Sequence, residues 1–172
     1  MNTNPRTRRM VTAALFAAVI TVVTAYFLHI PIPTGGYLHM GDTFIYLAAS
    51  ILPAPYAVFA ASVGAGLADL LTAPVWVLPT VLIKAVVALQ FTCRKEKFLC
   101  TRNVIATLAT LIVSPTLYSL ANCVIAKSWA AFIPQFWPTM IQAAASGAAF
   151  FVLGFLLDEA HFGSRAVKML GE

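Results

Sequence analysis

The sequence predicts an all-α integral membrane protein: a single membrane domain over residues 1–172 with six transmembrane helices. Hydrophobic residues make up 60% of the chain and charged residues only 10%, whereas a soluble domain carries about 25% charged residues. Stretches without Asp, Glu, Lys or Arg cover 10–41, 43–68, 70–83, 85–93, 103–126 and 128–157. Most of the basic residues lie between or outside these stretches, where loops are expected.

The length limits what else the chain can contain. Crossing roughly 30 Å of hydrocarbon takes about 20 helical residues, so 172 residues fit at most about six or seven crossings. No room remains for a large extramembrane catalytic or nucleotide-binding domain, and no Gly-rich loop leads into a Lys. We therefore expect no cofactor in this chain, and any ATP-driven work belongs to a partner.

The first half of the chain predicts three spans, at about 8–28, 41–52 and 55–72. The apolar core of the first span is longer than that of a signal peptide, so we expect it to be retained. Pro31, Pro33, Gly35 and Gly36 predict a loop after it. The second element is short for a full crossing. Either the loop before it enters the protein, or its helix begins within the loop.

The second half predicts spans at about 75–92, 104–126 and 139–157. A charged loop over 93–103 separates the fourth span from the fifth, in which Pro115 predicts a kink. Residues 127–138 contain Trp129, Trp137 and two prolines, a composition that predicts a loop on the membrane surface with aromatic anchors.

Charge placement predicts the orientation. Nine of the 11 basic residues fall in three clusters: Arg6, Arg8 and Arg9; Arg94, Lys95, Lys97 and Arg102; and Arg165 and Lys168. Six spans with cytoplasmic N- and C-termini place all three clusters inside, as the positive-inside rule requires. Nucleic-acid binding is not expected, because these charges flank apolar spans and form no solvated basic face.

Three ionisable residues are predicted at membrane depth, where such groups cost at least a few kcal/mol and are usually paired or functional. They are Asp42, which is also a candidate helix cap, Asp69 and Lys84. Two interpretations remain open. The residues form a buried Asp–Lys pair that fixes helix register, or one or more of them line a polar substrate pocket.

Further polar and aromatic residues are predicted near the outer side. They could stack on a planar ring and bind its heteroatoms, or serve as interfacial belt and packing residues. Together with the ionisable residues, the candidate substrate-binding set is Tyr37, His39, Asp42, Tyr46, Asp69, Trp76, Lys84, Asn122, Trp137 and Gln142. Tyr118 is either a pocket hydroxyl or a helix-packing group. The scattered His and Cys residues predict no metal site, and no catalytic motif is present, so an enzyme is not expected.

Small residues recur four positions apart in three of the predicted helices. The first helix carries two such pairs, Ala13 with Ala17 and Ala14 with Ala18. In lipid, small faces let helix backbones approach closely. These pairs therefore predict either packing within the protein or a docking surface for another membrane protein.

The order and spacing of these features resemble the S component, the substrate-binding membrane subunit, of energy-coupling factor (ECF) vitamin transporters. The resemblance covers nearly the whole chain. It rests on AALFAAV at 13–19, YLHMGDTFIYLAA at 37–49, VGAGLADLL at 63–71 and the L-P-T-x-x-I-K-A stretch at 78–85.

The resemblance implies a multi-pass protein of a bacterial plasma membrane that captures a vitamin or related micronutrient outside the cell. Partners would be a transmembrane T component and two cytoplasmic ATPases, with the T component contacting Ala13, Ala14, Ala17 and Ala18. Two alternatives remain: a membrane scaffold without a transported ligand, and a solitary ion-coupled carrier.

Overall fold

The computed structural model of the chain describes residues 4–27, 30–31, 37–92 and 97–170. These residues form seven α-helices, two 3₁₀ helices and a two-stranded antiparallel hairpin, which confirms the all-α class. The helices are α1 Pro5–Tyr26, α2 Gly41–Ile51, α3 Ala54–Thr72, η1 Pro74–Trp76, α4 Val77–Gln90, α5 Thr101–Ala126, η2 Trp129–Ala131, α6 Phe132–Glu159 and α7 Phe162–Met169. The strands are β1 Ile30–Pro31 and β2 Tyr37–Leu38.

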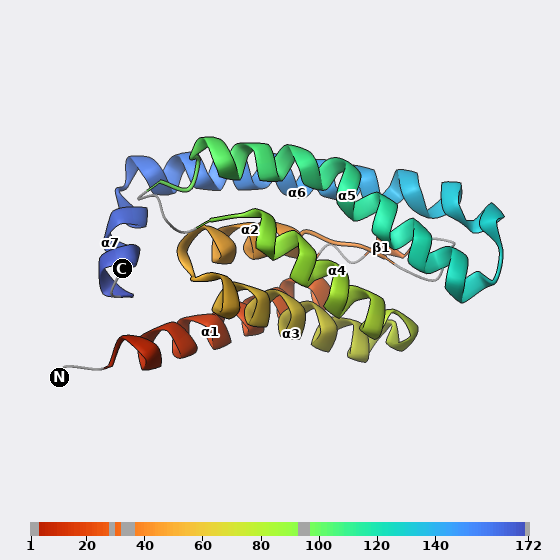
Figure 1. Cartoon of the computed structure of the whole chain (residues 1–172), viewed down its shortest axis with the longest axis horizontal. Coiled ribbons are helices and arrows are strands. Elements are labelled where there is room, and N and C mark those ends of the chain that lie inside the picture. Colours follow the sequence, from red (N-terminus) through yellow and green to blue (C-terminus); the bar gives the residue numbers. More distant parts are fainter. Residues whose placement is uncertain (1–3, 28–29, 32–36, 93–96, 171–172) are drawn as a thin grey trace.

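The helices form two layers with α2 between them (Figure 1). The long helices α5 and α6 lie side by side as one layer, and α1, α3 and α4 form the other. The short helix α7 lies at the end of the bundle where α1 begins. Almost every residue of α2 is buried, so this short helix is the centre of the core.

Four helical segments are long and apolar enough to cross a membrane: α1, α3, α5, and η2 together with α6. Large apolar side chains on these segments point outward, as Leu15, Leu70, Ile112 and Phe155 do. The buried positions of the same helices are mostly Ala, Gly, Ser and Thr. Helices that pack against each other in lipid show this pattern, with large apolar side chains toward the lipid and small residues at the helix contacts.

Helix α2 has 11 residues, which span about 16 Å at 1.5 Å per residue and cannot cross a bilayer alone. The segment before it enters the bundle. The Tyr37 hydroxyl contacts Asp69 of α3, and the backbone N–H of His39 donates to Gln142 of α6. The sequence left two possibilities, a loop that enters the protein or a helix that begins within the loop. These contacts agree with the first.

Close packing of α1 on α3 explains one set of small residues. A Cβ added to Gly64 would lie 2.8 Å from the Ala17 carbonyl oxygen and 2.9 Å from Ile20 Cβ. The Thr21 hydroxyl donates to the Gly64 carbonyl at 2.9 Å across the same contact. Glycine at position 64 thus permits the backbones to approach closely enough for this hydrogen bond.

One expectation about the second half of the chain is wrong, and one helix was not expected. Residues 127–138 are mainly helical, because η2 covers part of them and α6 begins at Phe132. Pro134 lies in the first turn of α6, where its missing N–H costs no helical hydrogen bond. The C-terminal helix α7 was not predicted. Its eight residues are too few and too polar to resemble a span.

Candidate functional site

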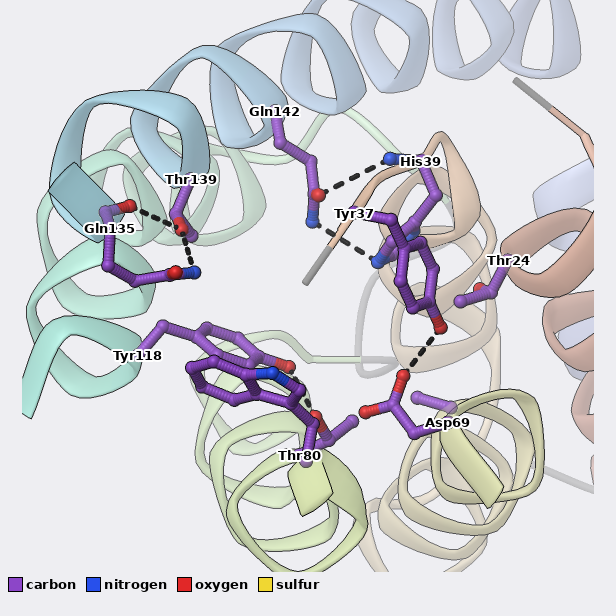
Figure 2. A pocket seen from close by; sticks show the side chains of 11 residues that line it. Thr24, Tyr37, His39, Asp69, Thr80, Tyr118, Gln135, Thr139 and Gln142 are labelled. Atoms are coloured by element: carbon purple, nitrogen blue, oxygen red, sulfur yellow. Dashed lines mark hydrogen bonds between the residues drawn. The ribbon is translucent and has the colours of Figure 1, made fainter. Parts of the chain in front are cut away.

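A polar cavity lies between the two layers, next to the segment that enters the bundle (Figure 2). Side chains from α1, α3, α4, α5 and α6 surround it, together with those of Tyr37 and His39. The lining consists of Thr24, Tyr37, His39, Ala65, Asp69, Trp76, Thr80, Tyr118, Gln135, Thr139 and Gln142. Its volume is about 40 Å³, well below the roughly 300–1,000 Å³ of typical ligand pockets.

Local structure explains how the lining converges. Gln135, Thr139 and Gln142 are spaced four and three residues apart on α6, so they share one helical face. The α3–η1–α4 turn brings Asp69, at the end of α3, close to Trp76, at the end of η1. One face of α6 therefore forms one wall of the cavity, and the α3–η1–α4 turn forms another.

Asp69 is the acid of this cavity. The Tyr37 hydroxyl donates to Asp69 Oδ1 at 2.5 Å, and Thr80 contributes a second side-chain hydrogen bond to the carboxylate. In this contact the Tyr37 hydroxyl is the donor and the carboxylate oxygen the acceptor. Asp69 forms no ion pair with any residue that the structure describes.

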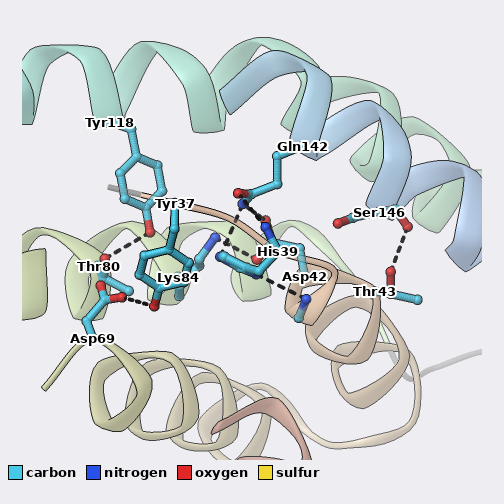
Figure 3. Close-up of polar contacts among 11 residues, drawn as sticks. Tyr37, His39, Asp42, Thr43, Asp69, Thr80, Lys84, Tyr118, Gln142 and Ser146 are labelled. Carbon is cyan, nitrogen blue, oxygen red and sulfur yellow. Dashed lines mark hydrogen bonds and ion pairs between the residues drawn. The ribbon is translucent and has the colours of Figure 1, made fainter. Parts of the chain in front are cut away.

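Next to the cavity, Asp42 and Lys84 form a buried ion pair (Figure 3). Lys84 Nζ lies 2.6 Å from Asp42 Oδ1, and both side chains are almost fully buried. Gln142 Nε2 donates to the other oxygen of Asp42 at 3.2 Å. The pair thus links α2 to α4, and Gln142 extends the link to α6. The expected capping role of Asp42 is wrong. Met40 is the N-cap residue of α2 and makes no side-chain hydrogen bond, and Asp42 lies in the first turn of the helix.

Two lining groups have no hydrogen-bond partner among the residues that the structure describes. Gln135 is buried and its Nε2 donates to the Thr139 hydroxyl at 3.1 Å, but its Oε1 accepts no hydrogen bond. The hydroxyl oxygen of Thr24 is likewise buried without a partner. Buried polar groups are nearly always satisfied, so orphaned ones at a cavity wall favour a ligand-binding role.

The rings of Trp76 and Tyr118 form the aromatic part of the cavity lining. The rings of Trp76 and Tyr118 lie 5.9 Å apart at 48° to each other, and the Tyr118 hydroxyl donates to Thr80 Oγ1 at 3.0 Å. This hydrogen bond joins α5 to α4 beside Asp69. The cavity therefore offers ring faces together with carboxylate, amide and hydroxyl groups.

The structure gathers half of the predicted substrate-binding set around the cavity. Tyr37, His39, Asp69, Trp76 and Gln142 line it. Asp42 and Lys84 lie behind the lining as the ion pair. Their roles toward a ligand remain predictions.

Three other members of the set lie away from the cavity. Tyr46 is stacked on Phe91 at 4.9 Å within the aromatic core. Asn122 donates to the Ala131 carbonyl and holds η2 against α5, and Trp137 is 54% exposed. These contacts agree with structural and interfacial roles.

Other lining residues were outside the predicted set. Thr24, Thr80 and Thr139 are threonines within helices, which sequence gives no reason to single out. Gln135 lay in a segment predicted as a loop. The helical spacing of Gln135, Thr139 and Gln142 would have indicated one face once α6 was extended to Phe132.

The alanine pairs of α1 face opposite ways. Ala13 and Ala17 are buried in the bundle, whereas Ala14 and Ala18 are exposed. The burial of Ala13 and Ala17 agrees with packing within the protein, and docking through Ala14 and Ala18 remains a prediction. Among the described residues, no group of His, Cys, Asp or Glu is arranged to hold a metal ion.

Comparison with known proteins agrees with this architecture. Residues 4–158 match the family model described as ECF-type riboflavin transporter, S component. No curated protein and no solved structure matches the chain. The family match covers most of the chain and confirms the resemblance seen in the sequence. The protein belongs to the ECF-type riboflavin transporter S component family, a family of membrane transport subunits.

Proposed function

We propose that this protein is the substrate-binding subunit of an ECF-type importer and captures a vitamin or related micronutrient from outside the cell. The observation that carries the proposal is the cavity. Gln135 Oε1 and the Thr24 hydroxyl line it without a hydrogen-bond partner among the described residues, and Asp69, which forms no ion pair with a described residue, lines the same space. The family assignment gives this cavity its transport context.

The proposed topology has six crossings of a bacterial plasma membrane, with α2 and the segment before it making one of them. Both termini lie in the cytoplasm. Hydrogen bonds from Arg8 and Arg9 to carbonyl groups at the end of α7 support this, because they place two basic clusters at one end. Asp158 accepts from the backbone N–H of Phe98, so Lys97, a described member of the third cluster, lies at that end too. The cavity is nearer the opposite end, because Trp76 of η1 and Gln135 near the start of α6 line it.

Transport energy comes from partners in this proposal. A T component contacts α1, and two ATPases hydrolyse ATP in the cytoplasm. The exposed face with Ala14 and Ala18 is the docking surface, because both side chains are small and exposed and would let another helix approach closely. Ala13 and Ala17 support it from behind by packing inside the bundle.

Ligand capture requires the cavity to widen, since about 40 Å³ holds only water-sized molecules. The segment with Tyr37 and His39 is the element whose movement opens the cavity, because it is held by side-chain hydrogen bonds rather than by a helix. Riboflavin is the first ligand to test, because the family is described by it.

The test is native mass spectrometry of the purified chain, followed by uptake of the identified compound in cells that contain the partner subunits. We expect one small molecule per chain and uptake that depends on both the chain and ATP hydrolysis. An empty protein that binds no vitamin would favour the scaffold alternative. Uptake by this chain alone in liposomes would favour the solitary carrier.

A further inference from the structure

We propose that an apolar groove between α4 and α5 binds one acyl chain of a phosphate-bearing glycerolipid, and that the lipid phosphate pairs with Lys127. The groove is separate from the polar cavity and lies on the outward side of the same two helices. The choice of the outer leaflet rests on the proposed topology, whereas the lipid site itself does not depend on solute capture.

The groove lies where the two layers of the bundle meet, because α4 belongs to one layer and α5 to the other (Figure 1). Its volume is about 520 Å³, and all of the residues that line it are aliphatic or proline. On α5, Leu117, Ala121 and Ile125 are spaced four apart and form one row. Ala121 contributes only a methyl group, so the row is hollow at its centre.

The facing wall sets the length of the groove. Leu78, Leu82 and Val86 form a second row with the same spacing along α4. The eight-residue step from Leu78 to Val86 rises about 12 Å at 1.5 Å per residue. One leaflet of hydrocarbon is about 15 Å thick, half of the bilayer core. The groove therefore has the length and the chemistry of a site for an acyl chain rather than for a polar solute.

Charge at one end of the groove indicates the kind of lipid. Val124 and Ile125 line that end, and Lys127 follows them as the exposed C-cap residue of α5. Trp129 is 78% exposed beside it, as expected of an aromatic anchor at the level of the lipid headgroups. The phosphate of a glycerolipid is an anion at this depth, and a lysine ammonium binds phosphate as a point charge. The chain in the groove and the headgroup at Lys127 are thus parts of one molecule.

The groove lies directly behind the wall of the polar cavity. On α4, Pro79 lines the groove and Thr80 lines the cavity, and on α5 Leu117 and Tyr118 divide in the same way. The hydrogen bond from the Tyr118 hydroxyl to Thr80 Oγ1, at 3.0 Å, joins the two helices between these spaces. An acyl chain in the groove would pack against this contact from outside, and a lipid that binds only the folded chain raises its thermal stability.

The test is native mass spectrometry of the delipidated full chain in detergent, titrated with dioleoylphosphatidylglycerol or with dioleoylglycerol, which lacks the phosphate. We expect one tightly bound phosphatidylglycerol per chain and an increase in the unfolding temperature. Dioleoylglycerol should bind roughly fivefold more weakly, as for the loss of one charge pair at a membrane surface.

Two variants separate the chain site from the headgroup site. Ala121→Leu fills the hollow and should weaken the binding of both lipids roughly tenfold, because it displaces buried methylene groups. Lys127→Gln should weaken phosphatidylglycerol binding about fivefold and leave dioleoylglycerol binding unchanged.

Each variant has a matched control outside the groove. Ala145→Leu enlarges an exposed alanine of α6, and Lys168→Gln removes an exposed lysine of α7 at the opposite end. Both should bind as the unaltered chain does. Thermal unfolding without lipid identifies any variant that fails to fold. Since Lys127 is exposed, its variant keeps the test decisive if Ala121→Leu does not fold.

Three results would overturn the inference. They are equal lipid binding by folded Ala121→Leu and Ala145→Leu chains, an equal effect of Lys127→Gln on both lipids, and disulfide cross-linking between Leu82→Cys chains that lack the native cysteines. The last result would show that a second copy covers the groove. No vitamin is present in these measurements, so each of these results leaves solute capture standing. A chain that passes them and binds no vitamin would keep the lipid site and lose the proposed function.

Discussion

Two aspartates at membrane depth differ in role because their neighbours differ. Asp42 is neutralised by Lys84 and held by Gln142, so it fixes three helices in register. Asp69 receives hydroxyl donors alone and faces the cavity. Moving two charges out of water is costly, so a buried pair is stable only while both partners remain.

We expect Lys84→Met to destabilise the protein by about 3–5 kcal/mol, because it leaves Asp42 buried without its partner. The double variant Asp42→Asn with Lys84→Met should recover most of this loss, since no unpaired charge remains. Thermal unfolding in detergent measures both effects. Equal destabilisation in the single and double variants would show that packing, rather than charge, dominates at this position.

The tryptophans allow a test of the cavity's position. Trp76 is 3% exposed and lines the cavity, whereas Trp129 and Trp137 are 78% and 54% exposed and lie outside it. We expect bound riboflavin to quench Trp76 most strongly, so Trp76→Phe should remove most of the quenching signal. Trp129→Phe and Trp137→Phe should retain it. Quenching that instead depends on Trp137 would place the ligand on the outer surface.

Residue patterns alone could identify which polar groups need an explanation, but not how they pair. Asp42, Asp69 and Lys84 are conspicuous because charges are rare in apolar stretches. Which acid meets Lys84 depends on how α2 and α4 cross, and no local pattern records that. Thr80 and Thr139 carry no such signal, because threonine is common in helices that pack in lipid.

At the scale of the element, α1 presents two alanine faces with different neighbours. Ala17 is buried in the bundle, and its carbonyl oxygen lies close to Gly64 of α3. Ala18, its neighbour in sequence, is exposed. The same substitution at adjacent positions therefore tests folding at one and docking at the other.

We expect Ala17→Leu to lower thermal stability by about 1–3 kcal/mol, the usual cost of overpacking a tight contact. Ala18→Leu should leave stability and ligand affinity unchanged but reduce co-purification with the T component. Ala14→Leu should behave as Ala18→Leu does, since it lies one turn away on the same face. Unchanged co-purification in both exposed variants would remove the docking assignment for this face.

Long hydrophobic stretches of sequence predict the long helices correctly, as for α1, α3 and α5. Side chains that face lipid are apolar along the whole length of the helix. The sequence predicts a loop where α6 begins, because Pro134 and Pro138 are typical of helix breaks. Proline in a first helical turn is neutral, and sequence alone does not say which residue begins the turn. Helix α7 was missed because its stability depends on contacts with the distant end of α1.

At the scale of the whole molecule, the two ends of the bundle differ in chemistry. One end holds the start of α1, the 97–102 segment and α7. Hydrogen bonds tie α1 to the end of α7, and Phe98 to Asp158 at the end of α6. The other end holds η1 and η2, with the cavity nearby. The first of these ends carries the basic residues, and the positive-inside rule places such an end in the cytoplasm. In this orientation the cavity would open to the outside.

This orientation predicts which end a membrane-impermeant maleimide can reach. Ser128 precedes η2 and is exposed, as is Arg165 on α7 at the opposite end. In a background where Cys93, Cys100 and Cys123 are replaced, we expect Ser128→Cys to be labelled in intact cells. Arg165→Cys should be labelled only after permeabilisation, because the proposed topology places α7 on the cytoplasmic side. The reverse pattern would place the cavity on the cytoplasmic side, and capture from outside would then be impossible for this fold.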